Sequence, residues 1–251
     1  MPVNPEGVLA SRMRVAVIIP AHDEESSLPL VLDAIPAGLA EEIVVVDNAS
    51  TDRTAEAARS RGATVLFEPR RGYGAACLRG VDHLRASRPD VVVFLDADYS
   101  DHPEEMPKLL EPIVRDGVDL VIGSRAPRFR EPGALLPQAR LGNWLATRLI
   151  RFLYGGPFTD LGPFRAVRFE ALLGLGMADR DFGWTAEMQV KALKSGLGVR
   201  EVPVSYRRRV GSSKITGTVS GTFKAGAKIL WTIARNAVST RRDGGARRGG
   251  E

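Results

Sequence analysis

The chain contains few of the residues that build disulfides and transition-metal sites. Its 251 residues include one cysteine, Cys77, and three histidines, His22, His83 and His102, which are scattered along the sequence. A single cysteine excludes an intramolecular disulfide and a cysteine-based zinc cluster, and it fits a reducing compartment. Scattered histidines argue against a histidine-rich metal site. The chemistry of this protein must therefore depend on other side chains.

Long hydrophobic runs are absent as well. No stretch approaches the roughly eighteen uncharged apolar residues that a membrane-spanning helix needs, and residues 1–14 lack the apolar segment of a secretory signal. We therefore expect a cytoplasmic protein that touches the inner face of a membrane without crossing it. A hydrophobic content of 44% is ordinary for a folded domain and excludes a disordered or fibrous chain.

The formal net charge of +5 conceals an uneven distribution of charge. Residues 1–125 carry 13 basic and 21 acidic side chains, a formal charge of −8, whereas residues 126–251 carry 22 basic and 9 acidic ones, a charge of +13. A strongly basic half suggests an anionic partner, such as nucleic acid, phosphate groups or an anionic membrane.

The first half alternates short apolar runs with helical patterns. Strands are predicted at residues 15–19, 43–47, 64–67, 91–95 and 118–122, and helices at 27–35, 52–61, 75–86 and 103–116. Runs that are apolar on both faces, separated by helices, indicate an α/β fold with a Rossmann-like, mostly parallel central sheet and helices on both faces. Such sheets bind ligands beyond the carboxyl ends of their strands.

Four polar segments follow the first four predicted strands. They are residues 22–25, 48–52, 70–72 and 96–98. Asp96 and Asp98, two residues apart at a strand end, can share a hard divalent ion that keeps water and phosphate oxygens as its other ligands. Arg70 and Arg71, before a glycine-bearing turn and a helix start, suit a diphosphate. These segments predict an active-site edge.

The second half has a different pattern. Helices are predicted at 138–154, 182–194 and 218–238, a strand at 198–204, a basic glycine- and serine-containing loop at 205–217, and a disordered basic tail at 239–251. A glycine- and proline-containing segment at 155–165 should lead the chain back to the sheet. We expect one domain over residues 1–238, with its two halves at 14–125 and 126–238.

Two of these helices carry cations beside a tryptophan. In helix 138–154, Arg140, Arg148 and Arg151 lie beside Trp144 on a helical wheel, and in helix 218–238 Trp231 separates an apolar arc from Lys224, Lys228 and Arg235. This pattern is typical of amphipathic helices at a bilayer surface. The alternative interpretation is an ordinary surface helix packed on the sheet.

The order of the motifs resembles family 2 glycosyltransferases, which have the GT-A fold. The motifs are I-P-A-H-D-E-E (residues 19–25), V-V-D-N-A-S-T-D (45–52), R-R-G-Y-G-A-A (70–76), F-L-D-A-D (94–98) and I-G-S-R (122–125). T-D-L-G-P-F-R (159–165) and G-S-S-K (211–214) are similar to the polyprenyl-phosphate branch, which includes dolichol-phosphate mannose and glucose synthases. The resemblance implies inverting transfer from a nucleotide-diphosphate sugar to a dolichyl- or undecaprenyl-type phosphate.

The resemblance implies that residues 14–125 bind the nucleotide sugar and the metal and that residues 126–238 bind the acceptor. It also implies roles for individual residues. A nucleotide-sugar site would contain Pro20, Ala21, Glu24, Asp47 and Asp96, with Arg70 and Arg71 beside the diphosphate. Mg²⁺ or Mn²⁺ would bind at Asp96 and Asp98, and the metal at Asp98 would stabilise the leaving group. The acceptor phosphate would meet Arg125, Arg140, Arg208 or Arg209, and Lys214. Tyr99 and Ser100 stand where the branch often has Leu-Gln, which leaves a third metal ligand unassigned.

Two alternatives remain at this point. The same donor chemistry on a hydroxyl acceptor, such as a lipid-linked saccharide or a small molecule, needs a general base, for which Glu187 is the best candidate and Asp160 the second. A nucleic-acid-binding module is disfavoured, because aromatic residues make up only 6% of the chain and no stacking-platform or zinc-finger pattern is present. The sequence is compatible with a homodimer.

Overall fold

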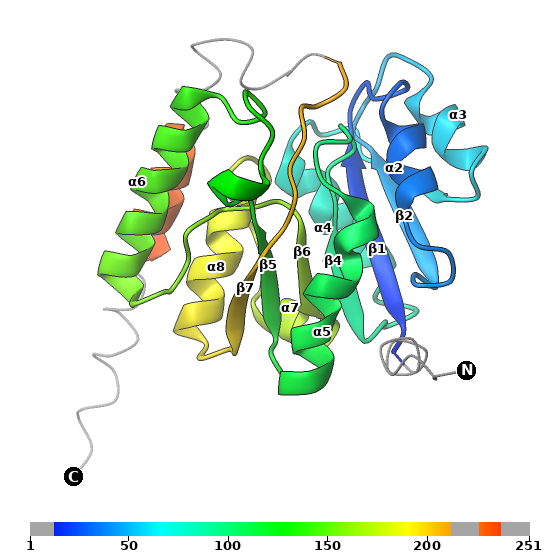
Figure 1. Ribbon diagram of the computed structural model, residues 1–251. Helices are drawn as coiled ribbons and strands as arrows, with labels where there is room; N and C mark the ends of the chain where they lie inside the picture. Colours follow the sequence, from blue (N-terminus) through cyan, green and yellow to red (C-terminus); the bar gives the residue numbers. More distant parts are fainter. Residues whose placement is uncertain (1–12, 212–225, 237–251) are drawn as a thin grey trace, which may run out of the picture.

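The centre of the fold is a sheet of seven strands in the order β3-β2-β1-β4-β6-β5-β7, seen in the computed structural model of Figure 1. The structure describes residues 13–211 and 226–236. The strands are β1 (Val15–Ala21), β2 (Glu42–Asp47), β3 (Thr64–Phe67), β4 (Val91–Phe94), β5 (Leu120–Ser124), β6 (Arg165–Arg168) and β7 (Val199–Pro203). All neighbouring pairs are parallel except the two made by β6, so the predicted mostly parallel sheet is confirmed.

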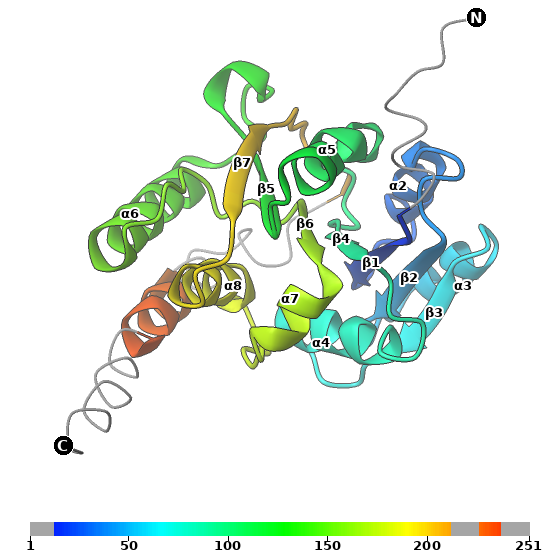
Figure 2. The same cartoon turned by 90° about the horizontal axis from the view of Figure 1, so that it is seen from below.

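Helices cover both faces of the sheet, as Figure 2 shows. One face carries α2 (Leu28–Ala34), α3 (Thr54–Arg59) and α5 (Met106–Asp116), and the other carries α4 (Tyr73–His83), α7 (Phe169–Gly174) and α8 (Trp184–Lys194). Short 3₁₀ turns at Pro103–Glu105 and Pro127–Phe129 complete the connections. Because side chains alternate along a strand, β1 sends Val17 to one core and Ile18 to the other, and both are fully buried.

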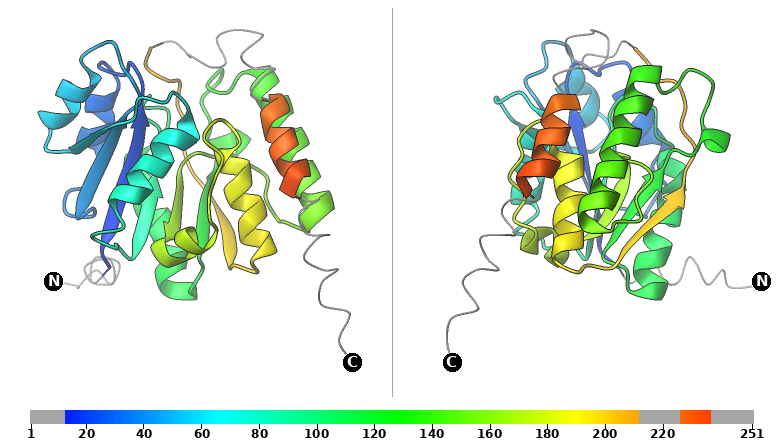
Figure 3. Two further views of the ribbon diagram at one scale, coloured as in Figure 1. Left: turned by 180° about the vertical axis from the view of Figure 1, so that it is seen from behind. Right: turned by 90° about the vertical axis from the view of Figure 1, so that its left-hand side faces the viewer.

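Helix α6 (Pro137–Tyr154) and the helix at residues 226–236 pack beside α8 at one end of the sheet (Figure 3). The Tyr154 hydroxyl donates to the carbonyl of Ile233 at 2.6 Å, and Ile233 is fully buried. The helix predicted at 218–238 is therefore confirmed over residues 226–236, and its remainder lies outside the described residues, as does the tail at 239–251. No helix in the described part of the chain has the length and hydropathy to cross a membrane.

The predicted return of residues 155–165 to the sheet is confirmed, since β6 begins at Arg165, but the sequence assigned neither a strand at β6 nor a helix at α7. Strand β6 is four residues long with arginine at both ends, so it lacks the apolar run that marks the other central strands. It nevertheless pairs antiparallel with both β4 and β5 in the middle of the sheet. Strands from both halves of the sequence thus form one sheet.

The position of β6 depends on the buried side chain of Arg165. Its guanidinium, fully shielded from solvent, donates to the carbonyls of Gly162 at 3.1 Å, Leu161 at 3.2 Å and Thr185 at 3.1 Å. Burial lowers the pKa of Arg165 to about 10. Since buried carbonyl groups need donors, this one side chain fixes both the segment before β6 and the start of α8.

We expect the substitution Arg165→Met to lower the free energy of unfolding by about 3 kcal/mol, because it removes the donors of three buried carbonyls. Chemical denaturation followed by circular dichroism measures the change. Arg88→Met is the matched control: Arg88 pairs with Glu170 on the surface, and an exposed ion pair contributes about 0.2–1 kcal/mol. Equal effects of the two substitutions would contradict the structural role of Arg165.

Candidate active site

The loops that follow β1, β2, β4 and β5 meet at one edge of the sheet. These four strands run in the same direction, because β5 and β4 are both antiparallel to β6. Their carboxyl ends therefore converge, and the polar segments that the sequence places after strands lie together at the upper edge in Figure 1. The site is assembled at this edge.

Asp96 and Asp98 occupy the turn after β4. Asp98 is 4% exposed, and its Oδ1 accepts hydrogen bonds from the Ser100 amide at 2.9 Å and the Ser100 hydroxyl at 2.5 Å. Its Oδ2 pairs with the guanidinium of Arg209. Asp96 lines the adjoining cleft. Burial, together with repulsion from Asp98, raises the pKa of Asp96 to about 7, while Arg209 and Arg125 oppose the rise.

The acidic residues at this turn fit a metal ion only if other ligands are supplied. No group of three or more His, Cys, Asp or Glu side chains in the described residues could hold a metal by itself. Mg²⁺ usually binds through one or two carboxylates, with substrate phosphates and water as the remaining ligands. Asp96 and Asp98 satisfy that requirement. Asp101, also buried nearby, has its pKa raised by burial and by these two neighbours.

The residues expected to hold the nucleoside lie on two adjacent strand ends. Pro20 and Ala21 end β1, and Ala21 is in register with Asp47 at the end of β2. The Asp47 side chain is mostly buried and accepts the Ser50 amide at 2.9 Å. Glu24 lies in the next loop, where its amide donates to Thr54 Oγ1 at 2.7 Å. The structure thus brings this predicted set together.

Arg70 and Arg71 are less closely tied to the site. Both side chains are exposed, and Arg71 donates to the carbonyl of Ala49 at 3.4 Å. The amides of Gly74 and Ala75 at the start of α4, where a diphosphate was expected, donate instead to the carbonyls of Asp181 and Arg180.

Gly72 and Gly74 lie directly against the same loop. A Cβ on Gly72 or on Gly74 would lie 2.2 or 2.1 Å from a carbonyl oxygen of the loop at residues 179–180. Their small size is therefore explained by the close approach of that loop. The contact of Arg70 and Arg71 with a diphosphate stays a prediction.

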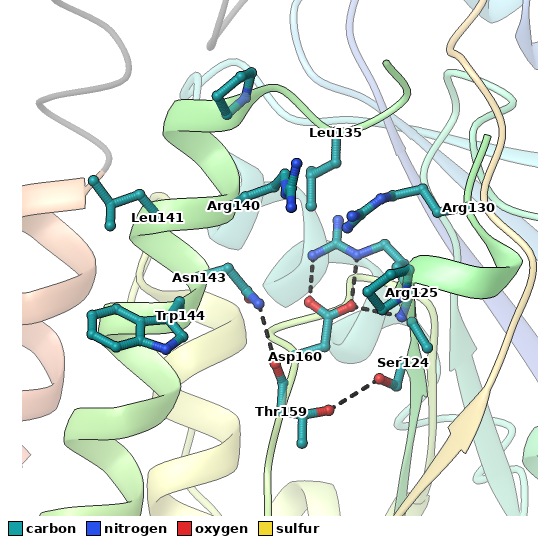
Figure 4. A pocket seen from close by; sticks show the side chains of 13 residues that line it. Ser124, Arg125, Arg130, Leu135, Arg140, Leu141, Asn143, Trp144, Thr159 and Asp160 are labelled. Atoms are coloured by element: carbon teal, nitrogen blue, oxygen red, sulfur yellow. Dashed lines mark hydrogen bonds and ion pairs between the residues drawn. The ribbon is translucent and has the colours of Figure 1, made fainter. Parts of the chain in front are cut away.

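Arg125 and Asp160 form a buried, bidentate ion pair (Figure 4). The Arg125 Nε donates to Asp160 Oδ2 at 2.8 Å, its Nη2 donates to Oδ1 at 2.6 Å, and its amide donates to Oδ2 at 2.7 Å. Burial alone would raise the pKa of Asp160, but Arg125 holds it below its usual value. Asp160 is therefore a fixed anion, and this argues against the expectation that it serves as a general base.

Three guanidiniums face a cavity of about 510 Å³ in front of this pair. Figure 4 shows Arg130 and Arg140 pointing toward Arg125 from the loop after β5 and from α6. Burial lowers the pKa of Arg130, and the nearby Arg140 and Arg125 lower it further. The cavity therefore holds three guanidiniums against the single carboxylate of Asp160, a charge distribution that favours an anion. Arg130 is not among the residues predicted to bind the acceptor phosphate. The only sequence feature that could have indicated it is its position in the arginine-containing loop at 126–137.

An apolar cleft continues from the same region. It also has a volume of about 510 Å³, and it runs from Asp96 and Arg125 along α6 to the helix at 226–236. Its apolar lining residues come mainly from these two helices and the loops beside them: Leu135, Leu136, Ala139, Leu145, Leu161, Phe182, Ile229 and Leu230. A ligand with an anionic head and an apolar tail matches the two adjoining cavities.

The structure separates the two arginines that the sequence could not distinguish. Arg208 donates through Nε to the carbonyl of Pro132 at 2.8 Å, whereas Arg209 pairs with Asp98. Both line the apolar cleft. Lys214, the other residue of this predicted set, lies outside the described residues.

The carboxylate of Glu187 is bound by backbone amides and by a lysine of the same helix. It is 5% exposed, its Oε2 accepts the Asp179 amide at 2.8 Å and the Ala178 amide at 3.1 Å, and its Oε1 pairs with Lys191 at 2.8 Å. Both oxygens are engaged within the fold. This arrangement argues against Glu187 as a free general base.

Comparison with known proteins agrees with the motifs and the fold. The chain is 43% identical to an uncharacterized glycosyltransferase of Mycobacterium tuberculosis over 84% of its own length and 94% of the relative's. It is 34% identical to an undecaprenyl-phosphate mannosyltransferase of Micrococcus luteus over 83% of this chain and 90% of that protein.

A solved structure of glucosyl-3-phosphoglycerate synthase from M. tuberculosis, in complex with Mn²⁺, uridine diphosphate and phosphoglyceric acid, has the same fold. Its TM-score is 0.75 at 23% identity, covering 94% of this chain and 84% of the other. The predicted GT-A fold is thereby confirmed. Residues 16–176 match the family described as glycosyl transferase family 2, and the chain therefore belongs to this family of glycosyltransferases.

Proposed function

We propose that this glycosyltransferase transfers a sugar, with inversion, from a nucleotide-diphosphate sugar to the phosphate of a polyprenyl phosphate at a membrane surface. The observation that carries the proposal is the arginine-lined cavity at Arg125, Arg130 and Arg140, which adjoins the apolar cleft. The same cleft reaches Asp96 of the acidic turn. The undecaprenyl-phosphate mannosyltransferase among the relatives supports the same acceptor class.

The nucleotide-sugar donor would bind at the acidic turn. Asp96 and Asp98 would hold Mg²⁺ or Mn²⁺, and the ion would supply positive charge against the departing diphosphate. Pro20, Ala21 and Asp47 lie where the nucleoside would bind, beside this turn. The solved synthase of the same fold, which contains Mn²⁺ and uridine diphosphate, supports a metal-dependent donor site here.

The acceptor half needs positioning and no proton removal. A lipid phosphate is already anionic at neutral pH, so its oxygen can attack the sugar without a general base. Arg130 and Arg140 would orient that oxygen, with Arg125 held in place by Asp160. A hydroxyl acceptor would need a free carboxylate, but Asp160 and Glu187 are both engaged in the fold. The two general-base candidates that the sequence offers are therefore both occupied, and this supports the phosphate acceptor.

The apolar cleft favours a lipid over a small phosphate-bearing acid. Phosphoglyceric acid in the solved synthase shows that a small acid can be bound by a protein of this fold. Such an acid would leave the leucine-lined cleft between α6 and the helix at 226–236 empty. A polyprenyl chain would fill it and bury apolar surface, at roughly 25 cal/mol per Å².

The outer surface of the same two helices suits an anionic bilayer. Trp144, Phe152 and Trp231 are exposed there, Phe152 by 85%. The guanidinium carbons of Arg148 and Arg235 lie 5.2 and 5.0 Å from the ring centres of Trp144 and Trp231. Aromatic rings beside cations are typical of surfaces that lie at the lipid headgroups.

Transfer of radiolabelled sugar tests the proposal directly. Purified protein would be incubated with Mn²⁺, a panel of UDP- and GDP-sugars, and either undecaprenyl phosphate in detergent or phosphoglyceric acid. We expect label to enter the organic phase with the lipid phosphate for at least one donor. Label on phosphoglyceric acid, with none on the lipid under any donor, would overturn the proposal.

The substitution Arg140→Gln should weaken binding of the lipid phosphate, because it removes a charge-assisted hydrogen bond from the arginine-lined cavity. We expect the KM for the lipid phosphate to rise about tenfold or more, with the KM for the donor unchanged. Steady-state transfer kinetics in detergent measure both constants. Arg85→Gln, which removes the same charge from an exposed site on the other half of the chain, is the control. An unchanged acceptor KM in Arg140→Gln would exclude this residue from the phosphate site.

The substitution Phe152→Ser should weaken membrane association without destabilising the fold, since its ring is exposed. Burial of a phenylalanine side chain is worth about 1.5–3 kcal/mol, so we expect partitioning to fall at least tenfold. Flotation with vesicles of phosphatidylglycerol and phosphatidylcholine measures it. Phe67→Ser, at a 58% exposed phenylalanine in β3, is the matched control. Equal partitioning of both variants and the wild type would place the membrane contact elsewhere.

A further inference from the structure

The carboxylate of Asp98 is fully engaged before any ligand is considered. One oxygen accepts two hydrogen bonds from Ser100, and the other pairs with the guanidinium of Arg209. A divalent cation at this turn and the guanidinium therefore compete for the same oxygen. If the cation and the guanidinium both contacted this oxygen, their two positive charges would lie close together and repel each other strongly.

The backbone beside Arg209 is fixed, and its side chain is free to change position. The Val210 amide donates to the carbonyl of Asp98 at 3.0 Å, and the Arg207 amide donates to the carbonyl of Ser100 at 2.9 Å. The segment 207–210 thus lies along the acidic turn. The Arg209 side chain is 34% exposed, so its guanidinium can move by rotation about its own bonds without displacing the segment.

If the Arg209 guanidinium leaves Asp98, it can enter the apolar cleft. Arg209, Arg125 and Asp96 line the same apolar cleft, and Arg125 also lines the arginine-lined cavity. A guanidinium that leaves Asp98 therefore stays beside the region where an acceptor phosphate would enter. Arg208 lines the same cleft, but its guanidinium donates to the carbonyl of Pro132 and not to Asp98.

We propose that Arg209 is a positioning residue that holds the place of the divalent cation on Asp98 until the donor binds, and is then released toward the anionic head of the acceptor. The inference rests on the proposed function, which supplies both the cation and the acceptor phosphate. Its consequence is coupling between the two substrates: donor and cation binding frees a guanidinium that strengthens acceptor binding. The same side chain weakens cation binding when the donor is absent.

Binding of Mn²⁺ alone, measured by electron paramagnetic resonance of the free ion, tests the competition without relying on activity. In Arg209→Gln the competing charge is gone, and we expect Mn²⁺ to bind roughly tenfold tighter than in the wild type. Arg208→Gln removes the same charge from the neighbouring residue and should leave the Mn²⁺ affinity unchanged. Arg209→Lys, which keeps a positive charge, should restore most of the competition.

The outcomes separate this inference from the proposed function. Mn²⁺ affinity in Arg209→Gln that equals or falls below that of the wild type overturns the inference, even if the wild type glycosylates the lipid phosphate. Equal tightening in Arg208→Gln also overturns it, because the effect would then be a general loss of charge. Tighter Mn²⁺ binding confined to Arg209→Gln supports it. The proposed function is judged separately, by sugar transfer from the wild-type protein to the lipid phosphate. Melting temperatures of all variants verify that each is folded.

Discussion

The buried ion pair between Arg125 and Asp160 is the contact on which the rest of the site depends. It joins the end of β5 to the segment that leads into β6. A buried pair of this kind is maintained only with good geometry and further hydrogen bonds, which the bidentate contact and the Arg125 amide supply. Because Asp160 can neutralise only one guanidinium, Arg130 and Arg140 leave the cavity with an excess of positive charge.

The acidic and basic sides of the cleft come from the acidic and basic halves of the sequence. The half at residues 1–125 supplies the acidic turn at Asp96 and Asp98, and the half at 126–251 supplies Arg130, Arg140 and Arg209. The sheet places these opposite charges on one edge, where an anionic donor with a cation and an anionic acceptor could meet. The pairing of Arg209 with Asp98 is one of several ion pairs between the two halves, and it lies at the acidic turn itself.

Most of the fold was predictable because hydrophobic periodicity determines it. The first five predicted strands agree with β1 to β5 to within about two residues at each end. Strand β6 was not predicted, because it has no apolar run and because one carbonyl that accepts from its buried Arg165 belongs to Thr185 in another element. Local sequence carries no signal for such a partner.

The site was predictable in its location and less so in its details. Their positions at strand ends predicted that Ala21, Asp47 and Asp96 lie at one edge of the sheet, and the structure places them there. Residue type alone could not show that Glu187 is engaged by backbone amides and Lys191, or that Gly74 is required by the approach of a loop at residue 179. These are tertiary contacts, and only the arrangement of the chain in space reveals them.

A crystal structure with Mn²⁺, uridine diphosphate and farnesyl phosphate would show where the acceptor phosphate binds. We expect the lipid phosphate within hydrogen-bonding distance of the guanidiniums of Arg130 and Arg140, and the prenyl chain between α6 and the helix at 226–236. A phosphate bound away from these arginines, or a prenyl chain outside the cleft, would show that the acceptor binds elsewhere.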